Sequence, residues 1–339
     1  MRKKSVQIVL PLIIIIMIII TIIGIGAYKN NTDNSTGKTH SVKNNVSKEY
    51  ESVDKSITKL VKWADDNDYI ASFYEDDTSS DWFTYSYSLY LDITGADSMD
   101  KYDKKLHNYI EKAKEYITNN KDKLYYTDYE RMTIVFEQID GKNSKEIRKI
   151  LSDNVLNNKE TDDKEINSLV FALIAMDTDT NVFDKSYDDM RQEYINQIID
   201  MELPDGGFSY AQDETDIDMT AMAVRALAPY YNTDMRVKEV IDRSLEIIEQ
   251  KQEKDGGFSS YGTYNSESLS QVILALCALD IDPLKDNRFI KSQNMIECLL
   301  SYQNRDGGFS HIKDMESDGI ASSQAMEALT KYLKQIYPE

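Results

Sequence analysis

The residues best suited to chemistry are carboxylates at the starts of three apolar helical stretches in the C-terminal half. When these stretches are aligned on a shared Ala-Leu dipeptide, Asp216 and Asp318 occupy equivalent positions, and Asp218 falls over Glu267. A buried carboxylic acid can donate a proton to a substrate, and a group of ionised ones can bind a cationic or hydroxylated ligand. These helix starts are therefore the candidate site.

Amides and tyrosines accompany the acids. Gln271 and Gln324 correspond to each other in the same alignment, and several of the 23 tyrosines lie near the same helix starts. A concave mouth ringed by helix starts is a natural position for a ligand; the alternative is that the tyrosines fill contacts between helices. The candidate ligand-binding residues are Thr220, Glu267, Gln271, Asp318, Gln324 and Tyr264, and the candidate catalytic residues are Asp216 and Asp218.

A phrase ending in Asp-Gly-Gly-Phe occurs three times and must position these helix starts. Its aspartates are Asp205, Asp255 and Asp306, about 50 residues apart, a period typical of stacked helix-pair units. We expect the glycine pair to end the preceding helix with a positive φ, and the phenylalanine to anchor the turn between helices. The Gln or Glu three residues before the aspartate should bind backbone groups freed at the helix end.

The helical pattern continues from about residue 49 to the end of the chain, without a competing strand pattern. Amphipathic helices are predicted near residues 50–65, 103–120, 143–155, 187–201, 235–251 and 286–302. More apolar helices are predicted near residues 80–94, 127–139, 164–176, 216–231, 265–279 and 318–335. Such pairs could close into a ring with the apolar set inside, and closure would remove the need for polar capping repeats.

The N-terminus predicts a membrane anchor. Basic residues precede an apolar run from Ile8 to Ala27, which is long enough to span a bilayer. Positive charge before the run favours a cytoplasmic N-terminus and a single-pass protein whose remaining chain is extracytoplasmic. Cleavage near Gly24-Ile25-Gly26, with secretion, is the alternative. Residues 1–28 are thus the predicted anchor, 29–48 a polar, disordered linker, and 49–339 the folded domain.

Composition excludes some partners. Lys and Arg number 39 against 59 Asp and Glu, giving a net charge of −20. Nucleic acid is therefore not an expected partner, because binding phosphates needs a basic face. The partners expected are the membrane, through the N-terminal helix, and a small-molecule or surface ligand. No cofactor or metal site is predicted, and Cys277 and Cys298 are expected to be buried thiols.

The repeated phrase contains Gln-x-x-x-Gly-x-Phe, which is similar to the Gln-x-x-x-Gly-x-Trp repeat of the squalene cyclase and protein prenyltransferase superfamily. This resemblance implies an all-α fold, an α/α toroid of six inner and six outer helices. The segments 215–230, 266–276 and 306–311 look like the toroid domains of Gram-positive cell-surface proteins. Those domains are related to the toroids of vitamin B12 carriers.

The resemblance also implies a candidate acid. Asp216-x-Asp218-Met219-Thr220 is similar to the Asp-x-Asp-Asp-Thr motif of class II terpene cyclases, in which the residue matching Asp218 protonates an alkene or epoxide. Met219 departs from that motif. The structural alternative is a capping box between Thr215 and Asp218. The zinc site of a protein prenyltransferase is not matched, because the chain has three histidines and no Asp-x-Cys.

The leading hypothesis is a membrane-anchored, extracytoplasmic toroid that binds a ligand or partner at the bacterial surface. A cyclase-like or prenyltransferase-like enzyme using Asp218 as general acid is the first alternative, and a structural spacer is the second. A cyclase should have a deep, aromatic-lined apolar cavity with Asp218 pointing into it. A binding module needs a concave mouth.

Overall fold

The computed structural model describes residues 39–95, 102–120, 124–140, 145–157, 165–178, 182–211 and 213–336. Residues 53–339 form one compact unit. Residues 1–52 are a separate unit, and its described part is the beginning of helix α2. The elements are α2 (Thr39–Asp66), α3 (Ser79–Thr94), α4 (Asp103–Asn120), α5 (Tyr126–Asp140), α6 (Lys145–Asn157), α7 (Ile166–Thr178), η3 (Lys185–Tyr187), α8 (Asp188–Asp200), α9 (Ile217–Leu227), η4 (Ala228–Tyr230), α10 (Met235–Lys251), β1 (Ser259–Ser260), β2 (Thr263–Tyr264), α11 (Ser266–Ala278), α12 (Met295–Leu300) and α13 (Gly319–Ile336).

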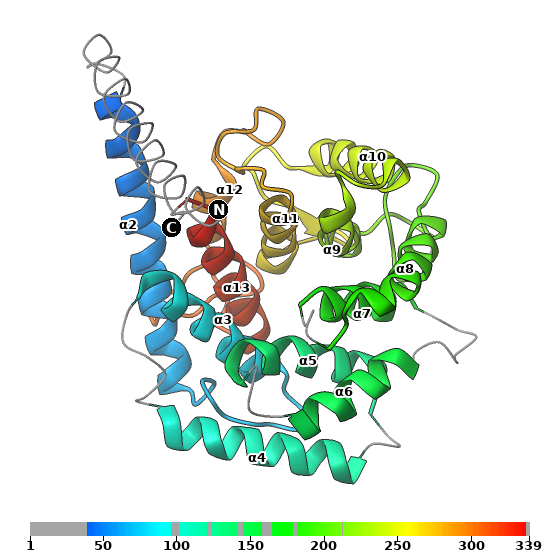
Figure 1. Cartoon of the computed structure of the whole chain (residues 1–339). Helices are drawn as coiled ribbons and strands as arrows, with labels where there is room; N and C mark the ends of the chain where they lie inside the picture. The colour runs from blue at the N-terminus through cyan, green and yellow to red at the C-terminus, as the bar shows by residue number, and fades with distance from the viewer. Residues whose placement is uncertain are drawn as a thin grey trace, which may run out of the picture. The chain divides into compact units, whose positions relative to one another are not determined.

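The inner helices form a closed ring within the unit 53–339. Helices α3, α5, α7, α9, α11 and α13 each pack against the next, and α13 returns to α3 (Figure 1). The amphipathic helices α2, α4, α6, α8, α10 and α12 alternate with them along the chain. Because α7 carries apolar residues around its whole circumference, it is buried on several sides, as an inner helix must be. The predicted α/α toroid is confirmed for the described residues.

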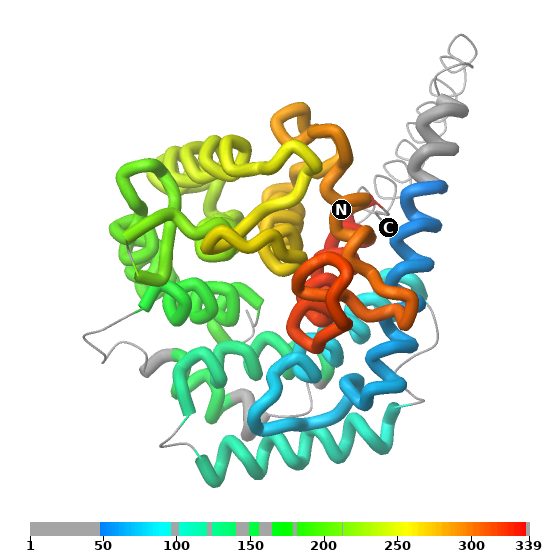
Figure 2. Tube along the Cα trace, turned by 180° about the vertical axis from the view of Figure 1, so that it is seen from behind, coloured from blue at the N-terminus to red at the C-terminus, as the bar shows by residue number. Residues whose placement is uncertain are grey.

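The repeated phrase forms the same turn three times. The first glycine of each pair has a positive φ, which is +95° at Gly206, +90° at Gly256 and +104° at Gly307. A side chain at Gly307 would place its Cβ 2.5 Å from the carbonyl oxygen of Lys59 in α2. The third turn therefore lies directly against α2 and closes the outer layer (Figure 2).

Each phrase is also tied to the inner helix that follows it. The phenylalanines Phe208, Phe258 and Phe309 are fully buried. The backbone N–H of Phe208 donates to Thr220 Oγ1 at 2.9 Å, and that of Phe309 donates to Ser322 Oγ at 2.7 Å. The start of the inner helix is therefore fixed relative to the turn.

The glutamines of the phrase behave as predicted. Gln252 donates to the carbonyl oxygens of Gly256 and Phe289, and Gln303 donates to those of Gly307 and Ser56. In the first copy Glu202 instead pairs with Arg243 of α10, at 2.6 Å.

The N-terminal half joins its helices through charged side chains. Asp81 in α3 is 2% exposed and accepts hydrogen bonds from the Tyr109 hydroxyl at 2.6 Å and from Arg131 Nε at 2.9 Å. Arg131 also donates to Asp128 at 2.9 Å. One carboxylate thus links α3, α4 and α5.

Some predicted boundaries were wrong. Helix α12 begins at Met295 because Asp286 accepts a hydrogen bond from the N–H of Arg288 and forms a local turn, while Asn294 caps the later start. Helix α9 ends at Leu227, where a 3₁₀ turn containing Pro229 follows.

The strands β1 and β2 form a small hairpin that was not predicted. Its turn residues Tyr261 and Gly262 both have positive φ.

The predicted N-terminal segments are only partly described. The apolar run 8–27 and residues 29–38 of the predicted linker lie outside the described residues. Helix α2 already begins at Thr39, so the last part of the predicted linker is helical. Its polar composition indicated disorder, but extending an existing helix costs much less than starting one. Among the helices that the structure describes, none is both long and apolar enough to cross a membrane.

Candidate functional site

Asp218 lies on the face of α9 that is directed toward the centre of the ring. Asp218, Met222 and Arg225 are separated by four and then three residues and therefore share one side of the helix. Met222 and Arg225 line a cavity enclosed by the inner helices. Asp218 lies one turn before them, at the start of α9, and does not itself line the cavity.

The carboxyl group of Asp218 is unusual among the described acids. Its Oδ1 is completely buried and has no hydrogen-bond partner of normal geometry in the described part of the chain. Burial raises the pKa of Asp218 to about 6, with a further increase from Asp216 and Glu267, whereas Ser268 and His311 act in the opposite direction. This carboxyl group is therefore about half protonated at pH 6 and mostly ionised at pH 7.

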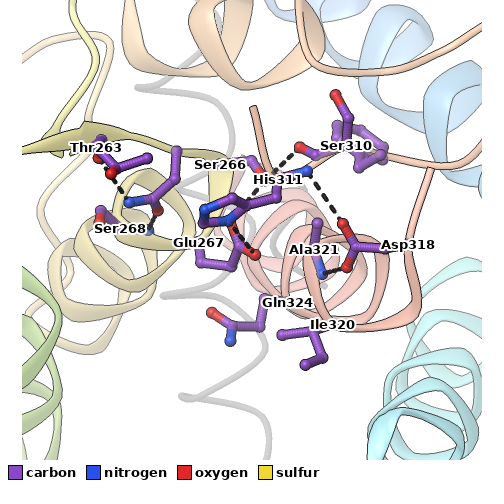
Figure 3. Close-up of polar contacts among 12 residues, drawn as sticks. Thr263, Ser266, Glu267, Ser268, Ser310, His311, Asp318, Ile320, Ala321 and Gln324 are labelled. Atoms are coloured by element: carbon purple, nitrogen blue, oxygen red, sulfur yellow. Dashed lines mark hydrogen bonds and ion pairs between the residues drawn. The ribbon is translucent and has the colours of Figure 1, made fainter. Parts of the chain in front are cut away.

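Glu267 and His311 form a polar pair at the start of α11. His311 Nδ1 lies 2.9 Å from Glu267 Oε1 and 3.0 Å from Oε2 (Figure 3). Because a carboxylate accepts hydrogen bonds, Nδ1 carries the proton in this pair and Nε2 is left as the second ring nitrogen. The His311 side chain is 49% exposed, so the ring is accessible to a ligand. Ser266 also donates to Glu267, at 3.1 Å.

Two predicted site acids cap helices. Asp216 Oδ1 accepts from the N–H of Met219 at 2.9 Å, and its Oδ2 accepts from the Ser260 hydroxyl. Asp318 accepts from the N–H of Ala321 at 2.8 Å and from that of His311 at 3.1 Å (Figure 3). Both add negative charge at the inner-helix starts, but their oxygens already accept hydrogen bonds that hold these helix starts in place.

The predicted roles of two threonines need correction. Thr220 is fully buried, accepts from the N–H of Phe208 and donates to the Asp216 carbonyl at 2.6 Å. Its hydroxyl therefore both accepts and donates within the protein and has a structural role. Thr215 does not form a capping box with Asp218, because its hydroxyl donates to Asp205 at 2.6 Å and Asp216 is the N-cap.

The cavity inside the ring has a volume of about 260 Å³. Its apolar walls come from Trp82, Phe171, Ile174, Met222 and Ile320. The Trp82 and Phe171 rings lie 6.1 Å apart between centroids. This central cavity is smaller than the roughly 300–1,000 Å³ of common ligand pockets, so its occupant must be compact.

Polar pairs bridge the central cavity. Gln271 Nε2 donates to Gln324 Oε1 at 2.9 Å, so the two predicted glutamines meet. Arg225 Nη2 and Glu327 Oε1 form an ion pair at 2.5 Å, with side chains 15% and 6% exposed. Figure 3 places Gln324 and Ile320 close to Glu267 on the neighbouring helix.

Tyr264 lies at the edge of the site. It belongs to β2 and is 44% exposed. The hairpin, the segment before α9 and the end of α10 enclose a polar groove of about 580 Å³ that includes Asp216 and Tyr261. Tyr264 lines neither this groove nor the central cavity, and its side chain forms a hydrogen bond with Glu253.

Sequence reasoning missed His311 as a site residue. The repeats contained the signal, because Tyr210, Ser260 and His311 each stand two residues after the phenylalanine of a phrase. Ser260 contacts Asp216, and His311 contacts Glu267. Each of these side chains thus reaches the helix start of the preceding repeat. Tyr210 follows the same rule by hydrogen bonding to Glu165, just before α7.

Five side chains lie at or near the starts of the inner helices α9, α11 and α13, and we call them the acidic mouth: Asp216, Asp218, Glu267, His311 and Asp318. Together they are chemically suited to holding a cation and to exchanging a proton. No three His, Cys, Asp or Glu side chains among the described residues lie in a metal-binding arrangement. An organic cation with N–H donors would satisfy the free oxygen of Asp218 without a metal's coordination geometry.

Comparison with known proteins gives one family match. The family described as the prenyltransferase alpha-alpha toroid domain matches residues 142–335. The chain is also 30% identical over 132 residues to a drimenyl diphosphate synthase from Streptomyces showdoensis. That match covers 38% of this chain and 24% of the synthase, so the chain corresponds to only part of that enzyme.

Solved structures share the fold at low sequence identity. An unsaturated glucuronyl hydrolase from Streptococcus agalactiae superposes with a TM-score of 0.60 at 14% identity, covering 84% of this chain and 92% of that one. A glycosyl hydrolase of family 88 from Bacteroides vulgatus superposes with a TM-score of 0.55 at 9% identity, covering 84% and 99%. This chain thus shares its fold with two hydrolases, and fold alone does not select a reaction.

Proposed function

The chain belongs to the prenyltransferase alpha-alpha toroid family, and on that premise we propose that it is a ligand-binding toroid whose acidic mouth holds a compact organic cation. The buried Oδ1 of Asp218, which has no hydrogen-bond partner of normal geometry among the described residues, carries this proposal. A buried carboxylate oxygen without a donor costs free energy, and a protonated amine would remove that cost by donating to it.

The surroundings of Asp218 favour a cation over a neutral ligand. Asp216 and Glu267 both add negative charge near Asp218 and raise its pKa. A bound ammonium group would be attracted by all of these acids and would lower the pKa of Asp218 again. The central cavity below could receive a small apolar or aromatic body against Trp82 and Phe171.

The cellular setting is part of the same proposal. The apolar run 8–27 and the basic residues before it support a membrane anchor with the toroid outside the cell. Protease treatment of intact cells should then degrade the toroid. Protection of the toroid on intact cells, with digestion after lysis, would contradict this location.

Calorimetry with phenylethylamine tests the binding site. We expect saturable binding, weakened about tenfold in the Asp218→Asn variant, because one charge-assisted hydrogen bond contributes about 1.5 kcal/mol or more. The matched control is Glu239→Gln, an exposed acid of outer helix α10. Affinity should also fall as the pH drops below about 6, the pKa of Asp218 in the free protein.

The same titration with phenylpropionate, in which a carboxylate replaces the amine, should show no binding that depends on Asp218. An equal loss of affinity for both probes in Asp218→Asn, or no effect of that variant on phenylethylamine binding, would contradict the proposal. Native mass spectrometry of the protein from its host would then identify any ligand that it retains.

A second function is favoured by one observation. The pKa of Asp218, about 6, suits a general acid at neutral pH, and the partial relative is named as a drimenyl diphosphate synthase. However, the central cavity of about 260 Å³ has the Arg225–Glu327 pair in its wall, which fits a polyprenyl chain poorly. Conversion of a linear prenyl diphosphate to a cyclic product, abolished by Asp218→Asn, would establish this enzyme function in place of simple binding.

A further inference from the structure

The ring has a second hollow at the end opposite the acidic mouth. Its lining comes from late positions of the inner helices, including Ile93 in α3, Cys277 in α11 and Lys334 in α13, and its volume is about 800 Å³. The central cavity is lined by earlier positions of the same helices, such as Trp82, Gln271 and Gln324. We call this second space the distal hollow.

Arg225 separates the two spaces. It lines both the central cavity and the distal hollow, and its ion pair with Glu327 crosses the ring between α9 and α13. Only Nη2 of the guanidinium forms a hydrogen bond with a described residue. The other N–H groups of Arg225 are therefore available on the cavity surfaces.

Two further cations face the distal hollow. Lys331 and Lys334 are three residues apart on α13 and so lie on one side of the helix. Neither lysine forms an ion pair with a described residue, and Lys331 Nζ lies 5.4 Å from the centroid of the Tyr85 ring. In a chain with a net charge of −20, two lysines without carboxylate partners beside a cavity are a distinctive feature.

Two acids also line the distal hollow, and neither forms an ion pair with these lysines among the described residues. Asp92 in α3 accepts a hydrogen bond from Gln138 Nε2 at 2.8 Å. Asp280 is exposed and lies two residues after the end of α11. The charge of Arg225 is offset by Glu327, and Leu89, Ile93 and Leu274 supply apolar wall.

We propose that the distal hollow is a second ligand site, specific for a small organic anion whose charged group lies between Lys331, Lys334 and the free N–H groups of Arg225. The apolar body of the ligand would lie against Leu89, Ile93 and Leu274. The two sites of the toroid then have opposite charge preferences and are separated by the Arg225–Glu327 pair.

Calorimetric titration of the full chain with hexanoate tests this proposal. Binding should be saturable and should weaken as salt is raised, because exposed lysines are screened. The double variant Lys331→Gln, Lys334→Gln should bind about tenfold more weakly or worse, a change of about 1.4 kcal/mol. The matched control is Lys313→Gln, which removes a lysine paired with Asp255 outside the distal hollow.

Two further titrations separate the sources of binding. Hexyl phosphate in place of hexanoate shows whether the site prefers a phosphate or a carboxylate, and any binding of hexylamine should be unchanged in the double lysine variant. Asp218→Asn should leave hexanoate binding unchanged, so this site and the acidic mouth can fail independently. Absence of saturable hexanoate binding, or equal affinity in the double lysine variant and the wild type, would overturn the proposal.

A stability measurement tests whether the lysines of α13 only stabilise the end of that helix. Lys334 lies in the last turn of α13, where a cation also offsets the partial negative charge of a helix end. That role predicts a small loss of thermal stability in the double variant and no change in anion affinity. Loss of affinity at unchanged stability supports the ligand site, and loss of stability alone contradicts it.

Discussion

Each half of the toroid places an aspartate near the start of an inner helix, and the two halves use it differently. Asp81, near the start of α3, is bound by Tyr109 and Arg131. Asp218, near the start of α9, has one buried oxygen without a partner among the described residues. The N-terminal half has no copy of the repeated Asp-Gly-Gly-Phe phrase and connects its helices through the charge of Asp81.

In the C-terminal half the phrase itself makes that connection. The turns at Gly206, Gly256 and Gly307 join outer to inner helices through backbone hydrogen bonds and close contacts. Because the turns hold the helices, the acids at the helix starts are not all needed for packing. A functional site could therefore develop at the helix starts of the C-terminal half without loss of the fold.

The largest effect is expected from Arg131→Ala in the N-terminal half. The substitution leaves the carboxylate of Asp81 buried without its cation, which should cost about 3–5 kcal/mol of unfolding free energy. Chemical denaturation of the variant measures this. The control Arg305→Ala changes an exposed arginine in the third phrase and should alter stability by no more than about 0.5 kcal/mol. Similar results for the two variants would show that the ionic network does not hold the N-terminal half together.

Gly307→Ala tests the turn that takes the place of the network in the C-terminal half. Its φ of +104° is unfavourable for alanine, and the new Cβ would lie 2.5 Å from the Lys59 carbonyl oxygen. Strain and overpacking together should cost about 2–4 kcal/mol by denaturation. Gly262→Ala is the matched control, since its φ is +78° but no atom lies within 4 Å of the new Cβ. It should cost about 1–2 kcal/mol, and an equal loss in both variants would exclude the contact with α2 as a source of stability.

Asp218→Asn should increase stability, and the increase should depend on pH. The native pKa of about 6 lies above the value of about 3.9 in an unfolded chain. The native state therefore binds the proton more tightly, and the contribution of Asp218 to stability falls as the pH rises from about 4 to 6. An amide cannot ionise, so the variant should be more stable than wild type by about 2–3 kcal/mol at pH 8 and show little gain at pH 4.

Thermal or chemical unfolding at both pH values checks the Asp218 prediction. Asp81→Asn provides the contrast, because it removes a carboxylate that is bound by Arg131 and should destabilise the protein at pH 8. A gain in stability from Asp218→Asn would be the behaviour of an acid retained for function at a cost in stability. A loss at pH 8 would mean that Asp218 is a structural acid like Asp81.

Much of the fold could be predicted from local signals. The period of the phrase, the glycine pairs and the alternation of amphipathic with apolar helices predicted the closed ring. The alignment of helix starts correctly paired Asp216 with Asp318 as equivalent positions, and both are N-caps. It also brought Gln271 and Gln324 to the same level, where they bind each other. Thr220 was misassigned because its motif resembled a catalytic one, while its position beside Phe208 depends on the folded turn.

The sequence by itself determined the elements and their order, because helix periodicity, glycine conformation and side-chain burial act over a few residues. Only the tertiary structure decided which charges are paired. Arg225 and Glu327 meet across the ring, His311 reaches Glu267 from the next repeat, and one oxygen of Asp218 is left without a partner among the described residues. These outcomes depend on distances between helices far apart in the chain, and electrostatic interactions and desolvation depend on those distances rather than on sequence spacing.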